Sequence, residues 1–110
     1  MQQNKVKSDF KLFRELLPKW QEKYMKKLNK EYIEILSKEG YASINFWELE
    51  KRIKEDKRYP GVIIRDLDKS NFDAYTLIFI RDELITEDDI KDFSDEFKEN
   101  IKMRRKIYGF

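Results

Sequence analysis

Residues 18–40 read PKWQEKYMKKLNKEYIEILSKEG, and their apolar side chains recur every three or four positions. The members of this stripe are Trp20, Tyr24, Leu28, Tyr32, Ile35 and Leu36. Such spacing places them on one face of an α-helix. Pro18 either kinks a helix that begins earlier or, as we favour, starts a new helix at its first position, and Gly40 suits a C-terminal cap. Oppositely charged residues four positions apart, Glu22 and Lys26 among them, favour the same helix.

Capping residues predict further helices on both sides of this segment. Ser8 is predicted to start a short helix that ends before Pro18. Asn45, with Glu48 in a capping box, is predicted to start a helix to about Asp56. Thr86 is predicted to start a last helix, with Arg104, Arg105 and Lys106 at its C-terminal end. Residues 1–7 are polar, and we expect them to be frayed. The sequence therefore predicts an all-α bundle of four to five helices, with residues 1–110 in a single domain.

Residues 62–85 permit two interpretations. Two β-prone runs, 62–64 and 75–80, would form a small hairpin over about 62–80 and make the protein α+β. The spacing of Phe72, Tyr75 and Phe79 instead fits a helix from near Ser70 to Leu84. Because the neighbouring elements are helical, we favour the helix.

The composition argues against most catalytic chemistry. The 110 residues include no histidine and no cysteine, while 42% are charged and 15% are aromatic. Without these two residue types, the chain lacks the usual proton shuttle, the thiolate nucleophile and zinc–sulfur ligation. The segment Asp66-Leu67-Asp68-Lys69-Ser70 opens like a calcium loop, but position 12 is Leu77 where the bidentate acid is required. We expect no enzyme activity, no metal and no cofactor.

The charges are unevenly distributed along the chain. Residues 1–30 carry nine Lys/Arg against three Asp/Glu, residues 61–99 carry five against twelve, and the tail after residue 99 carries four and no acid. A lysine-rich face in the first part is the best nucleic-acid candidate, with Trp20 and Tyr24 beside it to stack on bases. Its members are Lys19, Lys23, Lys26, Lys27 and Lys30.

The aromatic residues are the side chains best suited to binding a partner protein. Sixteen of them in so small a chain exceed what its core easily hides, so some are expected on the surface as anchors. Those that fall off the apolar stripes or at element ends are Tyr41, Trp47, Tyr59, Tyr108 and Phe110. The last two belong to a basic-aromatic tail over residues 102–110, which suits a docking peptide or a packed helix end.

We therefore expect a small non-catalytic protein–protein interaction module, such as a regulator, an adaptor or an inhibitor. Alanine at Trp47 or Tyr59 should then weaken partner capture and leave thermal stability nearly intact. The alternatives are a nucleic-acid-associated regulator and a homo-oligomer. The N-terminus lacks a secretory apolar core and no apolar run is long enough for a bilayer, so a cytoplasmic protein without membrane contact is expected.

A short resemblance supports part of this interpretation. The stretch from Thr76 to Lys91, with ITEDDI at 85–90, resembles the helical hairpin of several small bacterial domains, the SHOCT module among them. It covers about a sixth of the chain, and Glu83 lies where those hairpins often carry glycine. The resemblance implies two helices joined by a turn and no functional residue. Lysine- and isoleucine-rich usage further suggests a bacterial or phage source.

Overall fold

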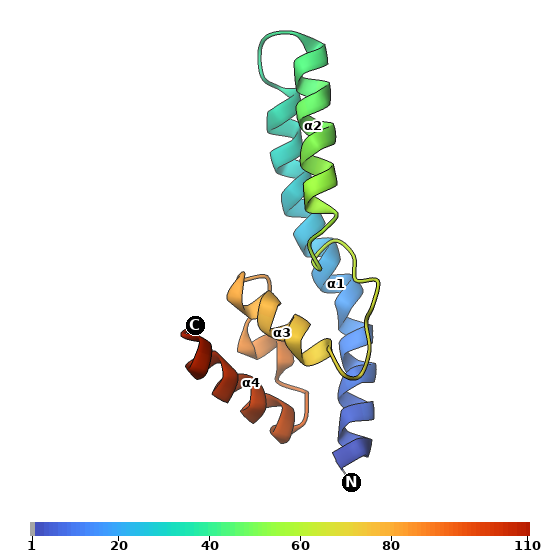
Figure 1. Ribbon diagram of the computed structural model, residues 1–110, viewed down its shortest axis with the longest axis vertical. Coiled ribbons are helices and arrows are strands. Elements are labelled where there is room, and N and C mark those ends of the chain that lie inside the picture. The colour runs from blue at the N-terminus through green and yellow to red at the C-terminus, as the bar shows by residue number, and fades with distance from the viewer. Residues whose placement is uncertain (1) are drawn as a thin grey trace. The chain divides into compact units, whose positions relative to one another are not determined.

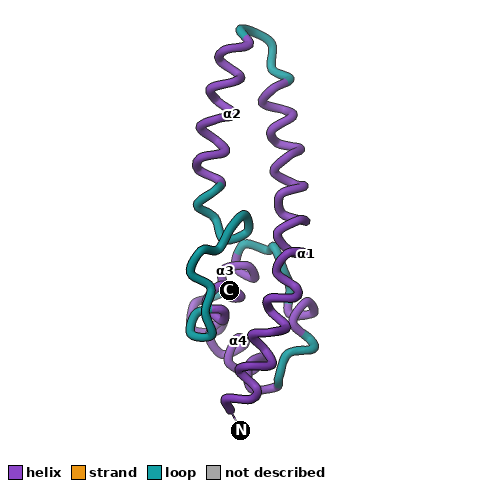
Figure 2. Tube along the Cα trace, turned by 90° about the vertical axis from the view of Figure 1, so that its right-hand side faces the viewer, coloured by secondary structure: helices purple, strands orange, loops and turns teal. Residues whose placement is uncertain are grey.

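The protein is all-α, as the sequence predicts. The computed structural model describes residues 2–110, with side chains from Asn4 onward. Its helices are α1 (Gln2–Leu36), α2 (Ala42–Asp56), α3 (Phe72–Arg81), the short 3₁₀ helix η1 (Glu87–Ile90) and α4 (Asp95–Tyr108). The described residues include no strand (Figures 1 and 2). The alternative of a hairpin over 62–80 is wrong, because α3 uses the helical spacing to bury Phe72, Thr76 and Phe79 on one face.

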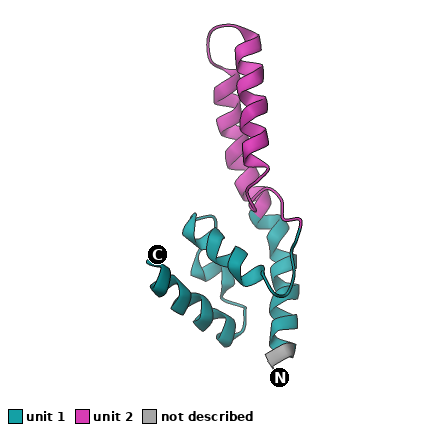
Figure 3. Cartoon of the chain, viewed as in Figure 1, with its two compact units in different colours: residues 1–20, 66–110 teal, residues 21–65 magenta. Residues whose placement is uncertain are grey.

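The chain forms two compact units (Figure 3). Unit 1 combines residues up to 20 with residues 66–110, and unit 2 comprises residues 21–65. Unit 2 is a helical hairpin, in which α2 returns alongside the second part of α1 (Figures 1 and 2). Because α1 contributes residues to both units, a single domain over residues 1–110 stays a prediction.

Helix α1 is longer than predicted at its start. It begins at Gln2 and continues through Pro18, so neither a helix start at Ser8 nor a new helix at Pro18 is correct. Residues 2–7, expected to be frayed, are helical, and Met1 lies outside the described residues. Proline removes one backbone hydrogen bond. Two buried side chains on either side of it, Phe13 and Trp20, offset that loss with rings 5.6 Å apart in an edge-to-face arrangement.

Unit 1 contains most of the buried apolar residues. Of the fourteen buried apolar residues in the described chain, twelve belong to unit 1 and only Leu28 and Ile35 belong to unit 2. The centre of unit 1 is aromatic, with the Phe72 and Phe97 rings stacked at 5.3 Å and Phe93 4.9 Å from Phe97. Unit 2 therefore leaves a larger share of its apolar surface uncovered.

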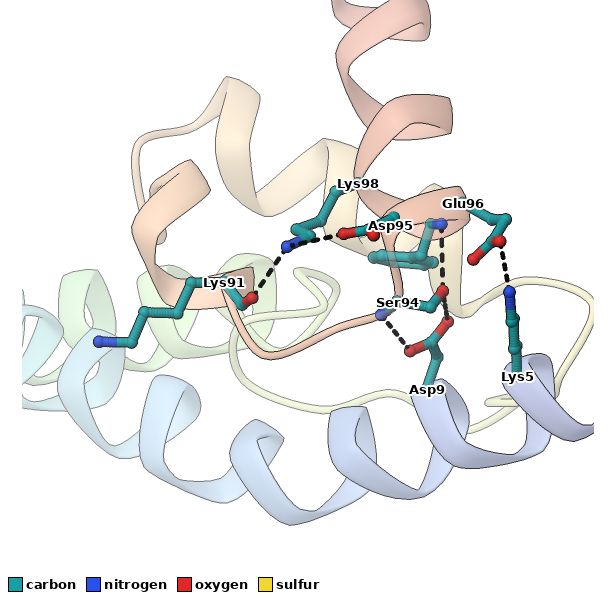
Figure 4. Close-up of polar contacts among 8 residues, drawn as sticks. Lys5, Asp9, Lys91, Ser94, Asp95, Glu96 and Lys98 are labelled. Carbon is teal, nitrogen blue, oxygen red and sulfur yellow. Dashed lines mark hydrogen bonds and ion pairs between the residues drawn. The ribbon is translucent and has the colours of Figure 1, made fainter.

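The last predicted helix is interrupted. Its start at Thr86 forms only η1, in which the Asp89 carboxylate accepts the Thr86 backbone N–H at 2.7 Å. Helix α4 then begins anew after Ser94, whose hydroxyl oxygen accepts the N–H of Phe97 at 3.2 Å. The Asp9 carboxylate of α1 explains the interruption (Figure 4). It accepts the backbone N–H of Ser94 at 2.8 Å and its hydroxyl at 2.6 Å, so this N–H does not continue a helix from η1.

Helix α3 ends in a Schellman motif, with Glu83 at the left-handed position. Leu84 N–H donates to the carbonyl of Phe79 at 2.8 Å and Glu83 N–H donates to that of Ile80 at 3.0 Å. Glu83 has φ of 60°, a conformation that costs an L-residue about 1–2 kcal/mol. This is the position at which the resembling hairpins carry glycine, and the geometry supplies the reason.

The variant Glu83→Gly is therefore expected to be more stable than the wild type by about 0.5–1 kcal/mol, after the extra backbone entropy of glycine is subtracted. Glu83 is exposed, so little side-chain contact is lost. Thermal unfolding followed by circular dichroism measures the change. Glu83→Ala, which retains the Cβ atom and the strain, is the matched control, and an equal gain in both variants would contradict the explanation.

Candidate functional site

Polar contacts fix the register of the hairpin in unit 2. Arg52 of α2 donates to Glu31 of α1 at 2.8 Å and pairs with Asp56 at 3.0 Å. The Tyr32 hydroxyl donates to Asp56 at 2.6 Å. Burial raises the pKa of Tyr32, and the hydrogen bond to Asp56 raises it further. The hydrogen bond to Glu31 is the main cause that raises the pKa of Arg52. The phenol therefore stays neutral and the guanidinium charged at neutral pH.

A second set of contacts closes the hairpin where α1 ends and α2 begins. Lys38 pairs with Glu48 at 2.8 Å, and the buried Asn45 side chain donates to the backbone carbonyl of Lys38 at 2.7 Å. Asn45 is thus inside α2, which begins at Ala42, and it binds the connecting segment instead of capping its own helix. Gly40 is also not a direct cap, because α1 ends at Leu36 and Gly40 lies in the connection with φ of 121°.

Large apolar side chains are exposed at this end of the hairpin. They are Ile33, Leu36, Tyr41, Ile44, Phe46 and Trp47, and we call them the tip cluster. Each is more than half exposed, from 53% for Leu36 to 78% for Tyr41. The tip cluster contains six of the eleven large apolar residues that the described chain exposes, within fifteen consecutive positions.

Helical spacing brings members of the tip cluster together in pairs. Ile33 and Leu36 are three positions apart on α1, and Ile44 and Trp47 are three apart on α2, so each pair lies side by side. The Phe46 ring meets the Trp47 ring edge-to-face at 4.9 Å. Isolated exposed apolar residues are ordinary, whereas several of them gathered at one end of a hairpin are typical of an interaction site.

A groove of about 610 Å³ lies within the same hairpin. Its apolar lining comes from Met25, Leu28, Tyr32, Ile53 and Val62. Charged side chains at Glu22, Lys26 and Lys57 also line it. Grooves of this kind receive amphipathic helices, whose apolar side chains recur at the spacing of one helical face.

The five aromatic residues predicted to bind a partner are divided between the two units. Tyr41 and Trp47 lie in the tip cluster, while Tyr108 and Phe110 belong to unit 1, with rings 6.4 Å apart. Tyr108 is exposed and Phe110 is half-buried. Tyr59 is also half-buried, because its ring packs on Tyr24 at 4.9 Å. Substituting Tyr59 would therefore remove a packing contact, so it is unsuitable as a surface probe.

The sequence reasoning missed four members of the tip cluster. Leu36 was assigned to the apolar stripe of its helix, while Ile33, Ile44 and Phe46 were not singled out as surface residues. One signal was available, since Ile44, Phe46 and Trp47 cannot all share a face with Leu49 and Ile53 at 100° per residue.

The predicted lysine face is exposed at all five positions: Lys19, Lys23, Lys26, Lys27 and Lys30. The two aromatic residues expected to stack on bases are not available for it. Trp20 is 5% exposed in the core of unit 1, and Tyr24 packs against Tyr59. Any nucleic-acid binding here would depend on phosphate contacts alone.

The polar loop before α3 satisfies its own hydrogen bonds. The Asp68 carboxylate accepts the N–H of Ser70 at 3.1 Å. The Asn71 side chain accepts the N–H of Asp68 and donates to the backbone carbonyl of Asp66. The Tyr75 hydroxyl donates to the Asp66 carboxylate, and this bond is the main cause that raises the pKa of Tyr75. Helix α3 follows Asn71, so Ser70 is not its cap. Over the described residues, no three Asp or Glu side chains gather as metal ligands would.

No family model, curated protein or solved structure matches this chain. Within residues 2–110, no helix combines the length and the apolar character needed to cross a bilayer.

Proposed function

We propose that this protein is a small, non-catalytic interaction module that binds another protein through the tip cluster. The observation that carries the proposal is the exposure of six large apolar side chains at one end of the hairpin, two of them Tyr41 and Trp47. Tryptophan and tyrosine are enriched among the residues that dominate binding energy in protein interfaces. Burying apolar surface contributes about 25 cal/mol per Å².

The surroundings of the tip cluster also suit an interface. Exposed charged residues border it, including Glu34, Glu39 and Lys51. Interfaces typically combine an apolar centre with a polar, solvated rim. The part-buried Arg52–Glu31 pair links α2 to α1, and the buried Asn45 side chain links α2 to the connecting segment, so the cluster is presented on fixed helices. Preorganisation of this kind reduces the entropy that binding costs.

A regulator, adaptor or inhibitor would use such a surface in the same physical way. The tip cluster would fill an apolar groove of the partner and compete with whatever else binds there. None of these roles requires a histidine or cysteine, and the chain contains neither. The partner is expected to present a complementary apolar groove with charges of both signs at its rim.

The test is a paired substitution, Ile44→Asp with Trp47→Ala. The free energy of unfolding is expected to change by no more than about 0.5 kcal/mol, because both side chains are exposed. Affinity for a partner purified with the wild-type chain should fall at least about tenfold, or 1.4 kcal/mol. Affinity purification from the source cells, followed by calorimetric titration with the purified partner, measures this.

The matched control for that experiment is Met103→Ala in unit 1, which removes another exposed apolar side chain, 54% exposed, outside the tip cluster. It should retain the partner with unchanged affinity. Equal losses in the control and the paired variant, or no loss in either, would reject the tip cluster as the binding surface.

The two alternatives give different results. A homo-oligomer built on the tip cluster would dissociate in the Ile44→Asp, Trp47→Ala variant, as light scattering after size exclusion would show. A nucleic-acid regulator would bind mixed DNA and RNA in fluorescence-anisotropy titrations, weaken steeply with salt, and lose affinity on Lys23→Glu with Lys27→Glu. The proposed module would show neither behaviour.

A further inference from the structure

Unit 1 contains an open groove between α3 and the end of α4. Its volume is about 410 Å³, within the range of about 300–1,000 Å³ that is usual for ligand sites. Ala74, Leu77 and Ile78 of α3 form one apolar wall. Tyr108 and Phe110 form the other, with their rings stacked at 6.4 Å. The groove therefore offers apolar contacts on two sides.

The charged residues that line this groove are both arginines, Arg81 and Arg104. Arg104 donates through Nη1 to Asp73 at 2.7 Å and to Asn100 at 3.4 Å, so its known bonds use one of its three nitrogens. Arg81 pairs with its neighbour Asp82, and its side chain is 54% exposed. No carboxylate is among the described lining residues.

The positive charge extends beyond the groove. Lys102, Arg105 and Lys106 line the adjoining hollow next to Phe110, where Glu87 is the one acid and already pairs with Arg105 at 2.9 Å. After Glu99, the chain contains no acidic residue. A ligand that complements this region electrostatically is therefore negatively charged. The same ligand must also have apolar side chains that enter the groove.

We propose that the α3–α4 groove binds an acidic, amphipathic peptide segment of a partner protein. Apolar side chains of the segment pack between Leu77 and Ile78 on one side and Tyr108 on the other. Its carboxylates form charge-assisted hydrogen bonds with Arg81 and Arg104, which lie along the same groove. This surface belongs to unit 1 and is independent of the tip cluster in unit 2.

A peptide fits these features better than an anionic membrane does. Leu77 lines the groove but is only 4% exposed, so a ligand reaches it only by inserting a side chain into the groove. A bilayer surface cannot project such side chains. Membrane-bound helices instead present a broad apolar face flanked by cations. The exposed Met103 and Ile107 provide only a narrow face of that kind, and they do not line the groove.

The probe is a synthetic amphipathic peptide of about 14 residues, with leucine at positions i, i+3, i+4 and i+7 and glutamate elsewhere. The full chain is expected to bind it, with amide shifts in the NMR spectrum centred on residues 74–81 and 104–110. A peptide with glutamine in place of every glutamate should bind at least about tenfold more weakly. Raising the salt concentration should weaken binding of the acidic peptide.

The variant Arg81→Glu is expected to reduce binding of the acidic peptide at least about tenfold, because it reverses a charge within the groove. Lys91→Glu makes the same charge change on exposed surface of unit 1 that lines neither the groove nor the adjoining hollow, and it should reduce binding by no more than about twofold. Both variants should retain the wild-type melting temperature.

Four outcomes would overturn the proposal. Equal affinity for the glutamate and glutamine peptides would show that the arginines do not contribute to peptide binding. Equal losses in Arg81→Glu and Lys91→Glu would indicate attraction by overall charge. Binding to phosphatidylserine vesicles without peptide binding, or self-association that Arg81→Glu abolishes, would assign the surface to a membrane or to a second copy of the chain.

Discussion

Replacing Phe13 with alanine is expected to lower the free energy of unfolding by about 3–5 kcal/mol. Phe13 is fully buried in unit 1, and its ring lies 5.6 Å from that of Trp20, 5.7 Å from that of Phe72 and 6.4 Å from that of Phe79. Alanine would remove all three ring contacts and leave a cavity. Because small domains are stable by about 5–15 kcal/mol in total, the loss is a large fraction of the whole.

Urea unfolding followed by circular dichroism measures this effect. Phe46→Ala is the matched control, since it removes the same side chain from an exposed position, and it should change stability by no more than about 0.5 kcal/mol. If Phe13→Ala does not fold, Phe13→Leu provides a milder test, with an expected loss of about 1–2 kcal/mol. Similar effects at Phe13 and Phe46 would mean that the aromatic centre of unit 1 is not its stabilising core.

Replacing Asp9 with alanine is expected to destabilise the protein by about 2–4 kcal/mol. Asp9 is 5% exposed, and its carboxylate accepts both the backbone N–H and the hydroxyl of Ser94, 85 positions along the chain (Figure 4). Alanine would leave both donors without their acceptor at the start of α4. The loss of helix content should be greatest in α4, as amide hydrogen exchange of residues 94–101 would report.

A conservative variant separates the effect of the hydrogen-bond acceptors of Asp9 from the effect of its charge. Asp9→Asn retains one acceptor oxygen of nearly the same shape, so its loss should be about half that of Asp9→Ala. Lys5→Ala is the control, because the neighbouring Lys5–Glu96 pair is solvent-exposed and should contribute nothing measurable. Equal losses for alanine and asparagine would show that the charge of Asp9, and not its two acceptors, determines stability.

Much of the helical content follows from local pattern. The stripe from Trp20 to Leu36 predicts the second part of α1, and the spacing of Phe72 and Phe79 predicts α3. The helix that is predicted to run from Asn45 to about Asp56 corresponds to α2, which ends at Asp56. Each depends on side chains three or four positions apart, whose relative placement a helix determines by itself.

The errors occur where a distant residue competes with a local preference. Asn45 has the sequence signature of a helix cap, but its amide binds the carbonyl of Lys38. Thr86 to Met103 has the pattern of one helix, yet Asp9 binds the N–H of Ser94 and begins a new one. Pro18 has the signature of a helix start, yet burial of Phe13 and Trp20 keeps α1 continuous. Rules for helix starts and caps consider only residues up to four positions apart, so they do not include these contacts.

The candidate site follows the same division. The sequence by itself determined an all-α chain, the faces of its helices and the surplus of aromatic residues, because these depend on spacing and composition. Only the tertiary structure decided which faces are covered. A stripe has the same spacing whether or not another element packs against it, so Trp20 became core, Tyr59 packed on Tyr24, and Leu36 and Trp47 stayed exposed.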